Sequence, residues 1–389
     1  MNGRTRTILV AHPSPDLYGS DRQLLETIRA LIDAGHRVNT ALPASGPLVP
    51  ELEALGARVA VVPFTVLRKS LLSPRSLAGL AARAVGEIAR LRSLIRADGA
   101  DLLLVNTVTL PWWAPAGRAA GVPVLAHVHE AEDTQNLLVR AGLNAPLLAA
   151  SRVVVNSRAA RDTLVRAQPL LARRTQVVHN GVPAPEAPPP PLRERLPQAT
   201  FHVAMVARLS PRKGVDVALD ALGHLRGDGL NASLRVCGSV FPGYEWYEEE
   251  LRERAARPDL AGHVELLGYV HPTWPVLYEA DAVVVPSRVE PFGNTAVEAM
   301  HAARPLVASR VQGLAEVVTD GVTGLLVAPG SPRALADALL SLAAGPERAR
   351  VLARTARREA AERFGVERYR ATMARVVEDL LAQGAEAPA

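Results

Sequence analysis

The sequence predicts an α/β protein made of two domains, each built on a doubly wound parallel sheet. A chain of 389 residues exceeds the length that one hydrophobic core usually serves, which indicates two domains. Short aliphatic runs alternate with helix-like segments along most of the chain, as expected for strands that helices cover on both faces. The proline-rich stretch Val182–Pro191 divides these runs into two series and predicts a stiff linker.

Seven runs predict the strands of the first domain. Each is short and mostly aliphatic, and each precedes a helix-like or turn-like segment. The predicted strands are Thr7–Ala11, Val38–Leu42, Val59–Pro63, Leu102–Val105, Val122–Val128, Val153–Val155 and Val177–His179.

Six further runs predict the sheet of the second domain, and residues 332–383 have a helical composition. We therefore expect a first domain at 1–183 joined by a C-terminal helix at 366–385, a linker at 184–197 and a second domain at 198–365. The predicted strands are Phe201–Ala207, Leu234–Cys237, Val264–Leu267, Ala282–Val285, Leu306–Ala308 and Gly324–Val327.

Positive charge is concentrated in the first half of the chain. Residues 1–185 hold 21 Lys and Arg against 13 Asp and Glu, whereas the remainder holds 23 against 26. A basic half can indicate a nucleic-acid partner, but no aromatic residues interleave with the charges and no nucleic-acid module is recognisable, so we expect none. An anionic membrane surface or an anionic lipid-linked substrate fits this charge better.

Residues 68–96 form the most basic segment, with seven Lys and Arg against one acid, Glu87. Apolar residues recur at helical spacing, which predicts a surface helix packed on the sheet. A second interpretation stays open, in which this helix also touches anionic lipid.

The sequence predicts a cytoplasmic protein, at most peripheral on the inner face of the membrane. The single cysteine, Cys237, cannot form an internal disulfide, which fits a reducing compartment. The N-terminus lacks the apolar region of a secretion signal. No apolar run approaches the roughly 18–20 residues that a membrane span needs.

The stretch Val283–Ala302 carries the strongest functional signal. It predicts a buried strand, a Pro/Gly turn that carries Glu290, and a helix with Glu298 about one turn from its start. Backbone N–H groups at a helix N-terminus carry partial positive charge and suit sugar hydroxyls or phosphates. The residues expected to bind such a donor between the two carboxylates are Pro291, Phe292, Gly293 and Asn294.

A second signal is the segment Val206–Val215, which follows the first predicted strand of the same sheet. Ligands bind at the carboxyl ends of strands in open α/β sheets. Arg208 can bind a diphosphate as a bidentate fork, and Lys213 can act as a point charge.

Together these segments resemble family 4 of the retaining nucleotide-sugar glycosyltransferases. Glu290 and Glu298 stand at the spacing of its E-x7-E signature, and Val206–Val215 is similar to its G-R-L-x-x-x-K-G motif with Ala207 replacing the glycine. The resemblance covers nearly the whole chain and is densest over 200–330. It implies a GT-B architecture, in which two Rossmann-like domains face each other across a deep cleft. The first would bind the acceptor and the second the sugar nucleotide.

The resemblance also implies a reaction. A nucleoside diphosphate would leave while an acceptor hydroxyl attacks the same face of the sugar, and the leaving phosphate would take the proton. Glu290 would bind sugar hydroxyls and support developing positive charge, and Glu298 would hold the ribose diol. No metal or other cofactor is implied. The sequence contains no D-x-D motif, and Arg208 and Lys213 can neutralise the phosphates.

In the first domain, the loop Ser14–Gln23 resembles the family's glycine-rich first loop, with Ser20 in place of the second glycine. Gly19 and Ser20 are expected at the donor phosphates, and Tyr18 and Asp21 on the acceptor side.

His129 and Glu130 follow the fifth predicted strand, and strand alternation points His127 to the same side as His129. A metal site lacks a third ligand here, and a purely structural histidine stays open. The resemblance implies that His129 lies near the reacting carbon of the sugar, with Glu130 on the acceptor side.

Weaker similarities complete the site. Gly268, Tyr269 and Val270 end a predicted strand beside the expected nucleobase pocket. Asn180–Val182 resembles the family's hinge, and Gln312 stands where a glycine is usual.

We expect the acceptor to be a lipid-linked or cell-surface glycan precursor. A soluble small-molecule or natural-product acceptor is the alternative, and a non-catalytic sugar-nucleotide-binding protein is the alternative of another class. Neither the sugar nor the base follows from the sequence.

Overall fold

The computed structural model describes residues 5–67, 74–130, 136–196, 198–241 and 243–386. The chain divides into two compact units, Met1–Gly181 with Val366–Ala389, and Val182–Gly365. It therefore passes from one unit to the other at residues 181–182 and returns at residues 365–366.

The first unit is built on a seven-stranded parallel sheet with the order β3-β2-β1-β4-β5-β6-β7. The order runs outward from β1 in one direction and from β4 in the other, so the switch point lies between these two strands. The strands are β1 (Thr7–Ala11), β2 (Arg37–Leu42), β3 (Arg58–Val61), β4 (Leu102–Val105), β5 (Val124–Val128), β6 (Arg152–Val155) and β7 (Thr175–Val177).

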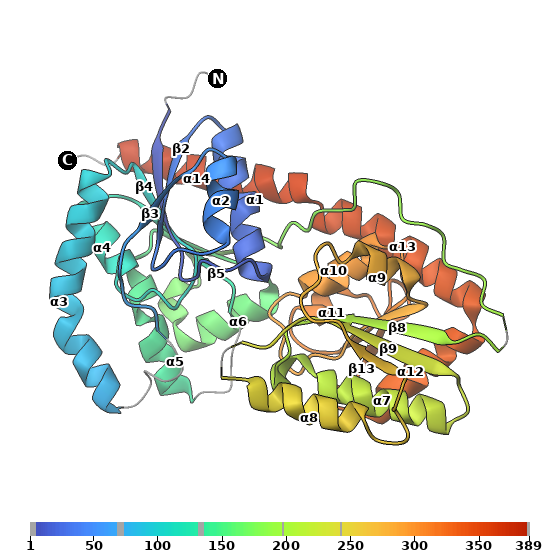
Figure 1. Cartoon of the computed structure of the whole chain (residues 1–389). Helices are drawn as coiled ribbons and strands as arrows, with labels where there is room; N and C mark the ends of the chain where they lie inside the picture. The colour runs from blue at the N-terminus through green and yellow to red at the C-terminus, as the bar shows by residue number, and fades with distance from the viewer. Residues whose placement is uncertain (1–4, 68–73, 131–135, 197, 242, 387–389) are drawn as a thin grey trace. The chain divides into compact units, whose positions relative to one another are not determined.

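Helices cover both faces of this sheet, as Figure 1 shows. Each β1, β4 and β5 residue is buried, because helices shield the central strands on both sides. The helices are α1 (Gly19–Asp33), α2 (Leu48–Ala54), α3 (Pro74–Ala97), α4 (Trp113–Ala120), α5 (Leu137–Asn144), α6 (Arg158–Ala167) and α14 (Val366–Glu386).

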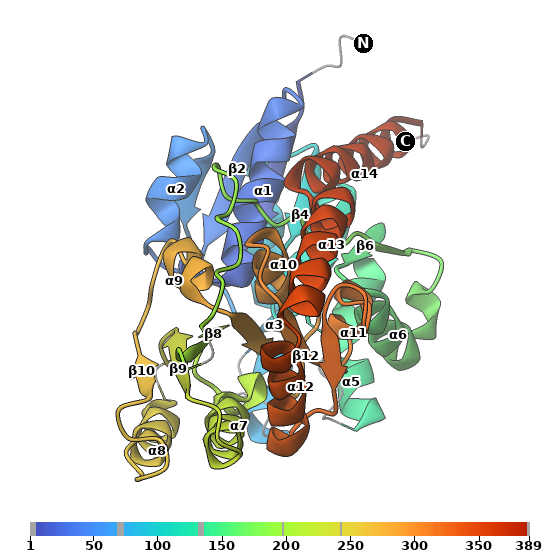
Figure 2. The same ribbon diagram turned by 90° about the vertical axis from the view of Figure 1, so that its right-hand side faces the viewer.

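The C-terminal helix α14 returns to the first unit and packs along α1, as Figures 1 and 2 both show. Its Met373 and Val377 are fully buried in the core that β1 and α1 share. Tyr369 Oη lies 2.5 Å from Thr27 Oγ1, and Arg370 donates to Glu26 Oε2. These contacts make the end of the chain part of the first unit.

The second unit has a six-stranded parallel sheet with the order β10-β9-β8-β11-β12-β13. Its switch point lies between β8 and β11. The strands are β8 (Phe201–Val206), β9 (Ala232–Cys237), β10 (Val264–Leu266), β11 (Ala282–Val285), β12 (Leu306–Ser309) and β13 (Leu325–Val327).

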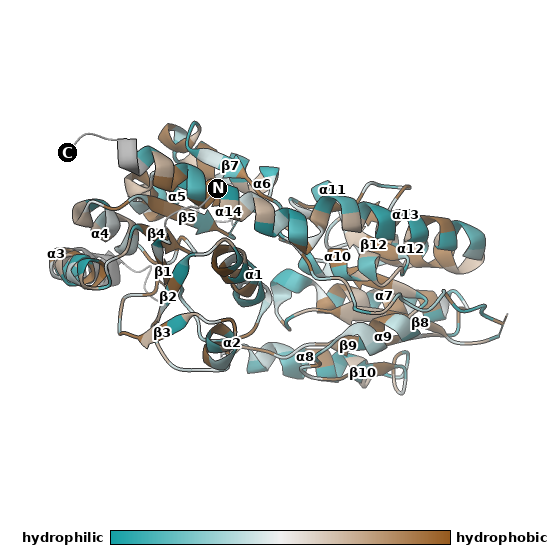
Figure 3. Cartoon of the chain, turned by 90° about the horizontal axis from the view of Figure 1, so that it is seen from above, coloured by the Kyte–Doolittle hydropathy of each residue, from teal (hydrophilic) through white to brown (hydrophobic). Residues whose placement is uncertain are grey.

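Helices α7 and α12 lie side by side against this sheet (Figure 2) and enclose part of its apolar core. Helices such as α1 and α13 carry both hydrophilic and hydrophobic segments (Figure 3), as expected where one side packs and the other meets solvent. The helices are α7 (Val215–Gly227), α8 (Glu245–Ala255), α9 (Trp274–Glu279), α10 (Asn294–His301), α11 (Leu314–Val317), α12 (Pro332–Ala344) and α13 (Pro346–Phe364).

The thirteen predicted strands all occur, and the bounds of β7 differ most. The strand spans Thr175–Val177 rather than Val177–His179. It lies at the edge of the sheet, where polar Thr175 and Gln176 are tolerated, so the apolar run did not mark its start.

The proline-rich segment packs against the second unit. Pro190 O accepts a hydrogen bond from Arg304 Nη1, and Arg195 Nη2 donates to Ala343 O. Leu192 also packs on the core of that unit.

The basic segment forms α3 from Pro74, whereas residues 68–73 lie outside the described residues. Leu91 and Ile95 are fully buried, while Arg83 and Arg90 are exposed; the side chains of Leu77 and Leu80 lie outside the description. Among the described residues, none of the helices has the length and apolar character needed to cross a bilayer.

Candidate functional site

In the second unit, the predicted residues gather where β8 and β11 end side by side at the switch point. The two strands pair directly, Ala282 with Val203 and Val283 with Ala204. The loop after β8 carries Arg208 and Lys213, and the loop after β11 carries Glu290. The crossover of the sheet therefore brings together residues that lie 77 positions apart.

Lys213 and Glu290 form an ion pair at the centre of this cluster. Lys213 Nζ lies 2.5 Å from Glu290 Oε2, which also accepts from Ser287 Oγ at 3.2 Å. Glu290 is only 6% exposed. Burial raises the pKa of Glu290, but the neighbouring Lys213 and Arg212 outweigh it and bring that pKa below its ordinary value. The carboxylate is therefore held in its charged form.

Two glycines allow the loops to approach one another backbone to backbone. Gly214 has φ +72°, and a Cβ there would lie 2.2 Å from Pro286 O. A Cβ on Gly313 would lie 2.2 Å from Pro291 O. Any larger side chain would displace the turn that carries Glu290.

Arg288 fastens the two loops to each other. Its Nη1 and Nη2 donate to Asp216 at 2.9 and 2.6 Å, and Nη1 also donates to Pro211 O. Tyr247 Oη donates to Asp216 Oδ1 at 2.7 Å. Burial raises the pKa of Asp216, but these hydrogen bonds bring it below the ordinary value.

Sequence reasoning missed Arg288 and Asp216, although a signal was present. Arg288 lies two residues before Glu290, within the segment Val283–Ala302, and Asp216 directly follows the segment Val206–Val215. Opposite charges flanking two residues of one site could have suggested their pairing.

Arg208 lies against an aromatic ring that sequence reasoning also missed. Its guanidinium carbon is 3.2 Å from the centroid of the Phe241 ring, a cation–π contact. Phe241 belongs to the loop after β9, the neighbour of β8. The contact holds the planar guanidinium at the end of the sheet.

The helix N-terminus predicted beside Glu290 is present. Helix α10 begins at Asn294, with Gly293 as its N-cap at φ +111°. Phe292 is 2% exposed and its ring packs edge-on against Phe364, so its side chain belongs to the core of the unit. Pro291 is buried beside it, and Glu298 is partly buried within α10.

Gly268, Tyr269 and Val270 follow β10, at the same carboxyl-terminal end of the sheet. Gly268 has φ +69°, and its carbonyl accepts a hydrogen bond from Gly238 N at 2.7 Å. Tyr269 is 53% exposed. This segment is thus held to the loop after β9 by its backbone, while the phenol faces solvent.

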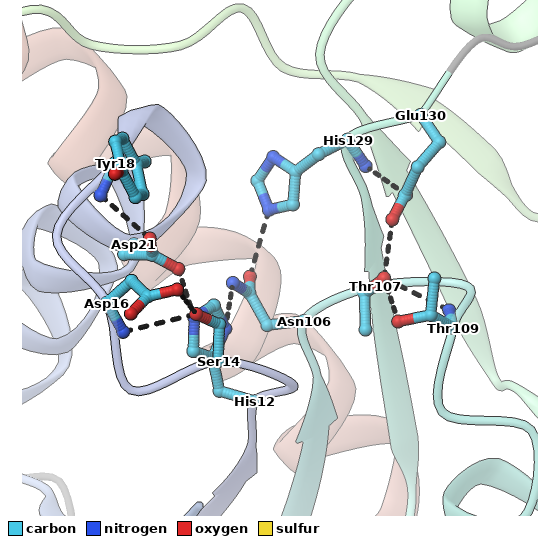
Figure 4. Close-up of polar contacts among 10 residues, drawn as sticks. All are labelled: His12, Ser14, Asp16, Tyr18, Asp21, Asn106, Thr107, Thr109, His129 and Glu130. Atoms are coloured by element: carbon cyan, nitrogen blue, oxygen red, sulfur yellow. Dashed lines mark hydrogen bonds and ion pairs between the residues drawn. The ribbon is translucent and has the colours of Figure 1, made fainter. Parts of the chain in front are cut away.

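In the first unit, a chain of hydrogen bonds links the ends of β1, β4 and β5, as Figure 4 shows. Asp21 Oδ1 lies 2.8 Å from His12 Nε2, His12 Nδ1 lies 3.0 Å from Asn106 Nδ2, and Asn106 Oδ1 lies 3.1 Å from His129 Nε2. His12, Asp21 and Asn106 are at most 3% exposed. The sequence indicated Asp21 and His129 but not His12 or Asn106, whose only signal is that each ends a strand.

Asp21 is buried within the first unit, so the acceptor-side contact expected of it stays a prediction. Its Oδ2 accepts from Tyr18 N at 2.8 Å, and its Oδ1 contacts His12. The carboxylate caps the start of α1, and burial leaves it within this network. Gly19 and Ser20, at the same helix start, are exposed as a phosphate contact would require.

His127 and His129 lie on the same side, which confirms the alternation. Their ring centroids are 4.0 Å apart. Burial, together with the nearby His12, lowers the pKa of His129 to about 3, and burial lowers the pKa of His127 as well. Both rings are therefore neutral near pH 7.

The carboxylate of Glu130 accepts two hydrogen bonds from residues of its own unit. Thr107 Oγ1 donates to Glu130 Oε1 at 2.5 Å, and His129 N donates to Oε2 at 2.9 Å (Figure 4). Burial raises the pKa of this carboxyl. Glu130 thereby fixes the backbone of the strand end that carries His129.

Both halves of the chain match known families. Residues 18–186 match the family described as Glycosyltransferase Family 4, and residues 193–359 match the one described as Glycosyl transferases group 1. The solved structure of Anabaena Alr3699/HepE in complex with UDP-glucose superposes with a TM-score of 0.79 at 25% identity, covering 96% of this chain and 100% of that one. The fold is thus that of the GT-B glycosyltransferases.

Relatives agree with this assignment. A glycogen synthase of Mycobacterium tuberculosis is 36% identical over 195 residues, which are 48% of this chain and 44% of the relative, so the match spans less than half of that protein. D-inositol 3-phosphate glycosyltransferase 1 of Catenulispora acidiphila is 27% identical over 86% of this chain and 84% of its own length. The two halves of the chain thus each match a glycosyltransferase family, and the matched segments together span most of its length.

Proposed function

We propose that the protein is a retaining glycosyltransferase that moves a sugar from a nucleoside-diphosphate sugar to an acceptor hydroxyl. The observation that carries the proposal is the Lys213–Glu290 ion pair at the switch point of the second sheet, with Arg208 beside it. An ammonium and a guanidinium suit a diphosphate leaving group, and a charged carboxylate suits the sugar hydroxyls and positive charge that develops at the reacting carbon.

The residues of the second unit would divide the donor between them. Arg208, Lys213 and the start of α10 would hold the diphosphate, and Glu290 the sugar. Glu298 would hold the ribose diol, and the backbone of 268–270 the base. Because two cations and a helix N-terminus offset the phosphate charge, the reaction would proceed without a metal. The leaving phosphate would accept the proton of the attacking hydroxyl.

A UDP-sugar is the first donor to test, since the related Anabaena protein was solved with UDP-glucose. Incubation with UDP-, GDP- and dTDP-sugars in excess EDTA should release nucleoside diphosphate with one of them. NMR of the product should show the anomeric configuration of the donor. Inversion would contradict the retaining reaction, and loss of activity in EDTA would contradict the metal-free one.

The two acids should separate kinetically. Glu298→Ala should raise the KM for the donor, because it would lose ground-state contacts to the ribose. Glu290→Ala should lower kcat, because its partner is the reacting sugar. Equal small effects would argue against separate roles and favour a non-catalytic nucleotide-binding protein.

For the acceptor, we propose a lipid-linked or cell-surface glycan precursor met at the inner face of the membrane. The exposed Arg83 and Arg90 on α3 support this, because each basic residue near an anionic surface contributes about 1 kcal/mol at low salt. A soluble polyol phosphate is the second candidate, favoured by the relative named for D-inositol 3-phosphate.

Flotation with vesicles that contain anionic lipid separates the two acceptors. Arg83→Glu with Arg90→Glu should abolish flotation at low salt, whereas the equally basic exposed pair on α13, Arg354→Glu with Arg358→Glu, should not. Indifference of the native protein to these vesicles would favour the soluble acceptor.

A further inference from the structure

We propose that Asp21, His12 and Asn106 act as positioning residues that hold His129 as the Nε2–H tautomer, with Nδ1 as a hydrogen-bond acceptor for a sugar hydroxyl. The inference rests on the proposed function for the role of Nδ1. The tautomer itself follows from the hydrogen-bond contacts in Figure 4 and does not depend on the proposed function.

The argument starts at the charged end of the chain. Asp21 Oδ1 can only accept, so His12 Nε2, 2.8 Å away, must carry the proton of that ring. Asn106 Nδ2 lies 3.0 Å from the other ring nitrogen, His12 Nδ1. An amide nitrogen only donates, so His12 Nδ1 is the acceptor of this hydrogen bond.

The amide of Asn106 transmits this choice. Its Nδ2 must donate to His12 Nδ1, which turns its Oδ1 toward His129. An amide oxygen accepts only, so His129 Nε2, at 3.1 Å, must be the protonated nitrogen. A buried amide with both ends engaged has no alternative partner to turn to at low cost.

Asp21 therefore sets the tautomer of His129 through a chain of three hydrogen bonds. His129 is neutral, because burial lowers its pKa to about 3. Its Nδ1 thus keeps a lone pair, and among the described residues no hydrogen bond to that atom occurs. The ring is partly exposed. A hydroxyl is the ligand that such an acceptor would take.

The sheet places three of the four members of the network. His12 directly follows β1, Asn106 follows β4 and His129 follows β5, and these three strands are neighbours in that order. Asp21 is set by its cap on Tyr18 N at the start of α1. Positions 9, 94 and 23 residues apart thereby come into one line.

The direct test is ¹⁵N NMR of the full-length protein labelled at histidine, with the His129 signals assigned by their loss in His129→Gln. The native protein should show a protonated Nε2 and an unprotonated Nδ1 for His129. Protonation on Nδ1 instead would overturn the inference. The tautomer is measured on the native protein and needs no activity; His129→Gln serves only to assign the signals.

Variants then test the origin of the tautomer. Asn106→Leu removes the acceptor, so the His129 ring should populate both tautomers and its two ¹⁵N shifts should converge. Asn106→Asp keeps an oxygen for Nε2–H and should restore the native pattern. Asn39→Leu removes an amide that donates to Asp98 from a nearby strand, β2, and should leave His129 unchanged. An unchanged tautomer in Asn106→Leu would contradict the proposed network.

Kinetics test the role of Nδ1. Loss of one acceptor in the transition state should lower kcat about tenfold in Asn106→Leu, with a smaller change in donor KM, and Asn106→Asp should recover most of it. If the native protein shows the Nε2–H tautomer but transfers no sugar, the proposed function fails while the tautomer assignment stands. If sugar transfer proceeds at the native rate in Asn106→Leu, the role assigned to Nδ1 is wrong.

Discussion

The ends of the two sheets carry polar clusters of opposite character. In the second unit the cluster is made of formal charges on the loops and on the first turn of α7, with Lys213 paired to Glu290 and Arg288 to Asp216. In the first unit it is a buried line of mostly neutral groups, in which Asp21 is the one carboxylate of the His12–Asn106–His129 chain. Charges suit a diphosphate, whereas neutral groups of fixed tautomer suit sugar hydroxyls. The contrast shows how one kind of sheet edge can be adapted to two kinds of ligand.

The largest expected effect tests the charged side of this comparison. Lys213→Ala should lower kcat/KM by about 30- to 1,000-fold, or roughly 2–4 kcal/mol in the transition state, because it removes a contact to the leaving group and leaves Glu290 buried without its partner. Steady-state kinetics measure this. Arg235→Ala, which breaks surface pairs with Glu265 and Glu279, is the control and should change little. A near-native rate for Lys213→Ala would remove the charged cluster from the mechanism.

The next effect concerns the close approach of the two loops. Gly214→Ala should lower the free energy of unfolding by about 1–3 kcal/mol more than Gly229→Ala does, measured by urea denaturation. Both glycines have positive φ, at +72° and +89°, but only at Gly214 would the new methyl meet a backbone oxygen. Equal losses would show that backbone conformation alone, and not the contact with Pro286, requires glycine there.

A pH dependence tests the neutral side. Unfolded His129 takes a proton near pH 6.5, whereas the folded protein keeps it neutral down to about 3. Its contribution therefore lowers stability as pH falls below 6.5, by up to about 1.4 kcal/mol per pH unit.

Urea unfolding at pH 7.5, 6.5 and 5.5 should accordingly show a shallower pH slope in His129→Gln than in the native protein. Asn156→Leu alters a neighbour that donates to His129 O without removing a titrating group, so its slope should stay native. An unchanged slope in His129→Gln would mean that the pKa of the ring is the same in the folded and the unfolded protein.

The smallest effect concerns Arg288. Its ion pair with Asp216 is about 40% exposed, so Arg288→Ala should cost at most about 1 kcal/mol of stability. The KM for the donor should nevertheless rise several-fold, because the loops that carry Lys213 and Glu290 lose a tie. Arg333→Ala, which breaks a similar surface pair with Asp228, should alter stability equally and leave KM unchanged. A parallel result for both would reduce Arg288 to a surface contact.

The charged cluster was predictable because its residues fall into two short segments, each continuous in sequence. Glu290, Glu298 and the start of α10 occupy one strand–turn–helix segment, and Arg208 and Lys213 occupy another. Local spacing therefore reports their geometry once each strand is recognised. The roles carried over from the family still await the kinetics described above.

The hydrogen-bond network around His129 could not be predicted from local sequence spacing. His12 and Asn106 are single polar residues after apolar runs, a pattern that many strand ends share. Asp21 was predicted on the acceptor side from its position in the first loop. That position does not predict the direction of its side chain. Burial of that side chain against His12 depends on how α1 packs on the sheet.

Alternating apolar runs by themselves predicted the two parallel sheets and their thirteen strands, because strand and helix periodicity is a local property of the chain. The motif segments that follow two of these strands predicted the charged residues at the second switch point. Only the tertiary structure decided which strand ends become neighbours, that α14 returns to the first unit, and that a carboxylate on α1 sets a histidine after β5. Hydrogen bonds between side chains of distant strands require their atoms to be placed to within about an ångström. Spacing along the sequence does not predict atomic positions that depend on packing.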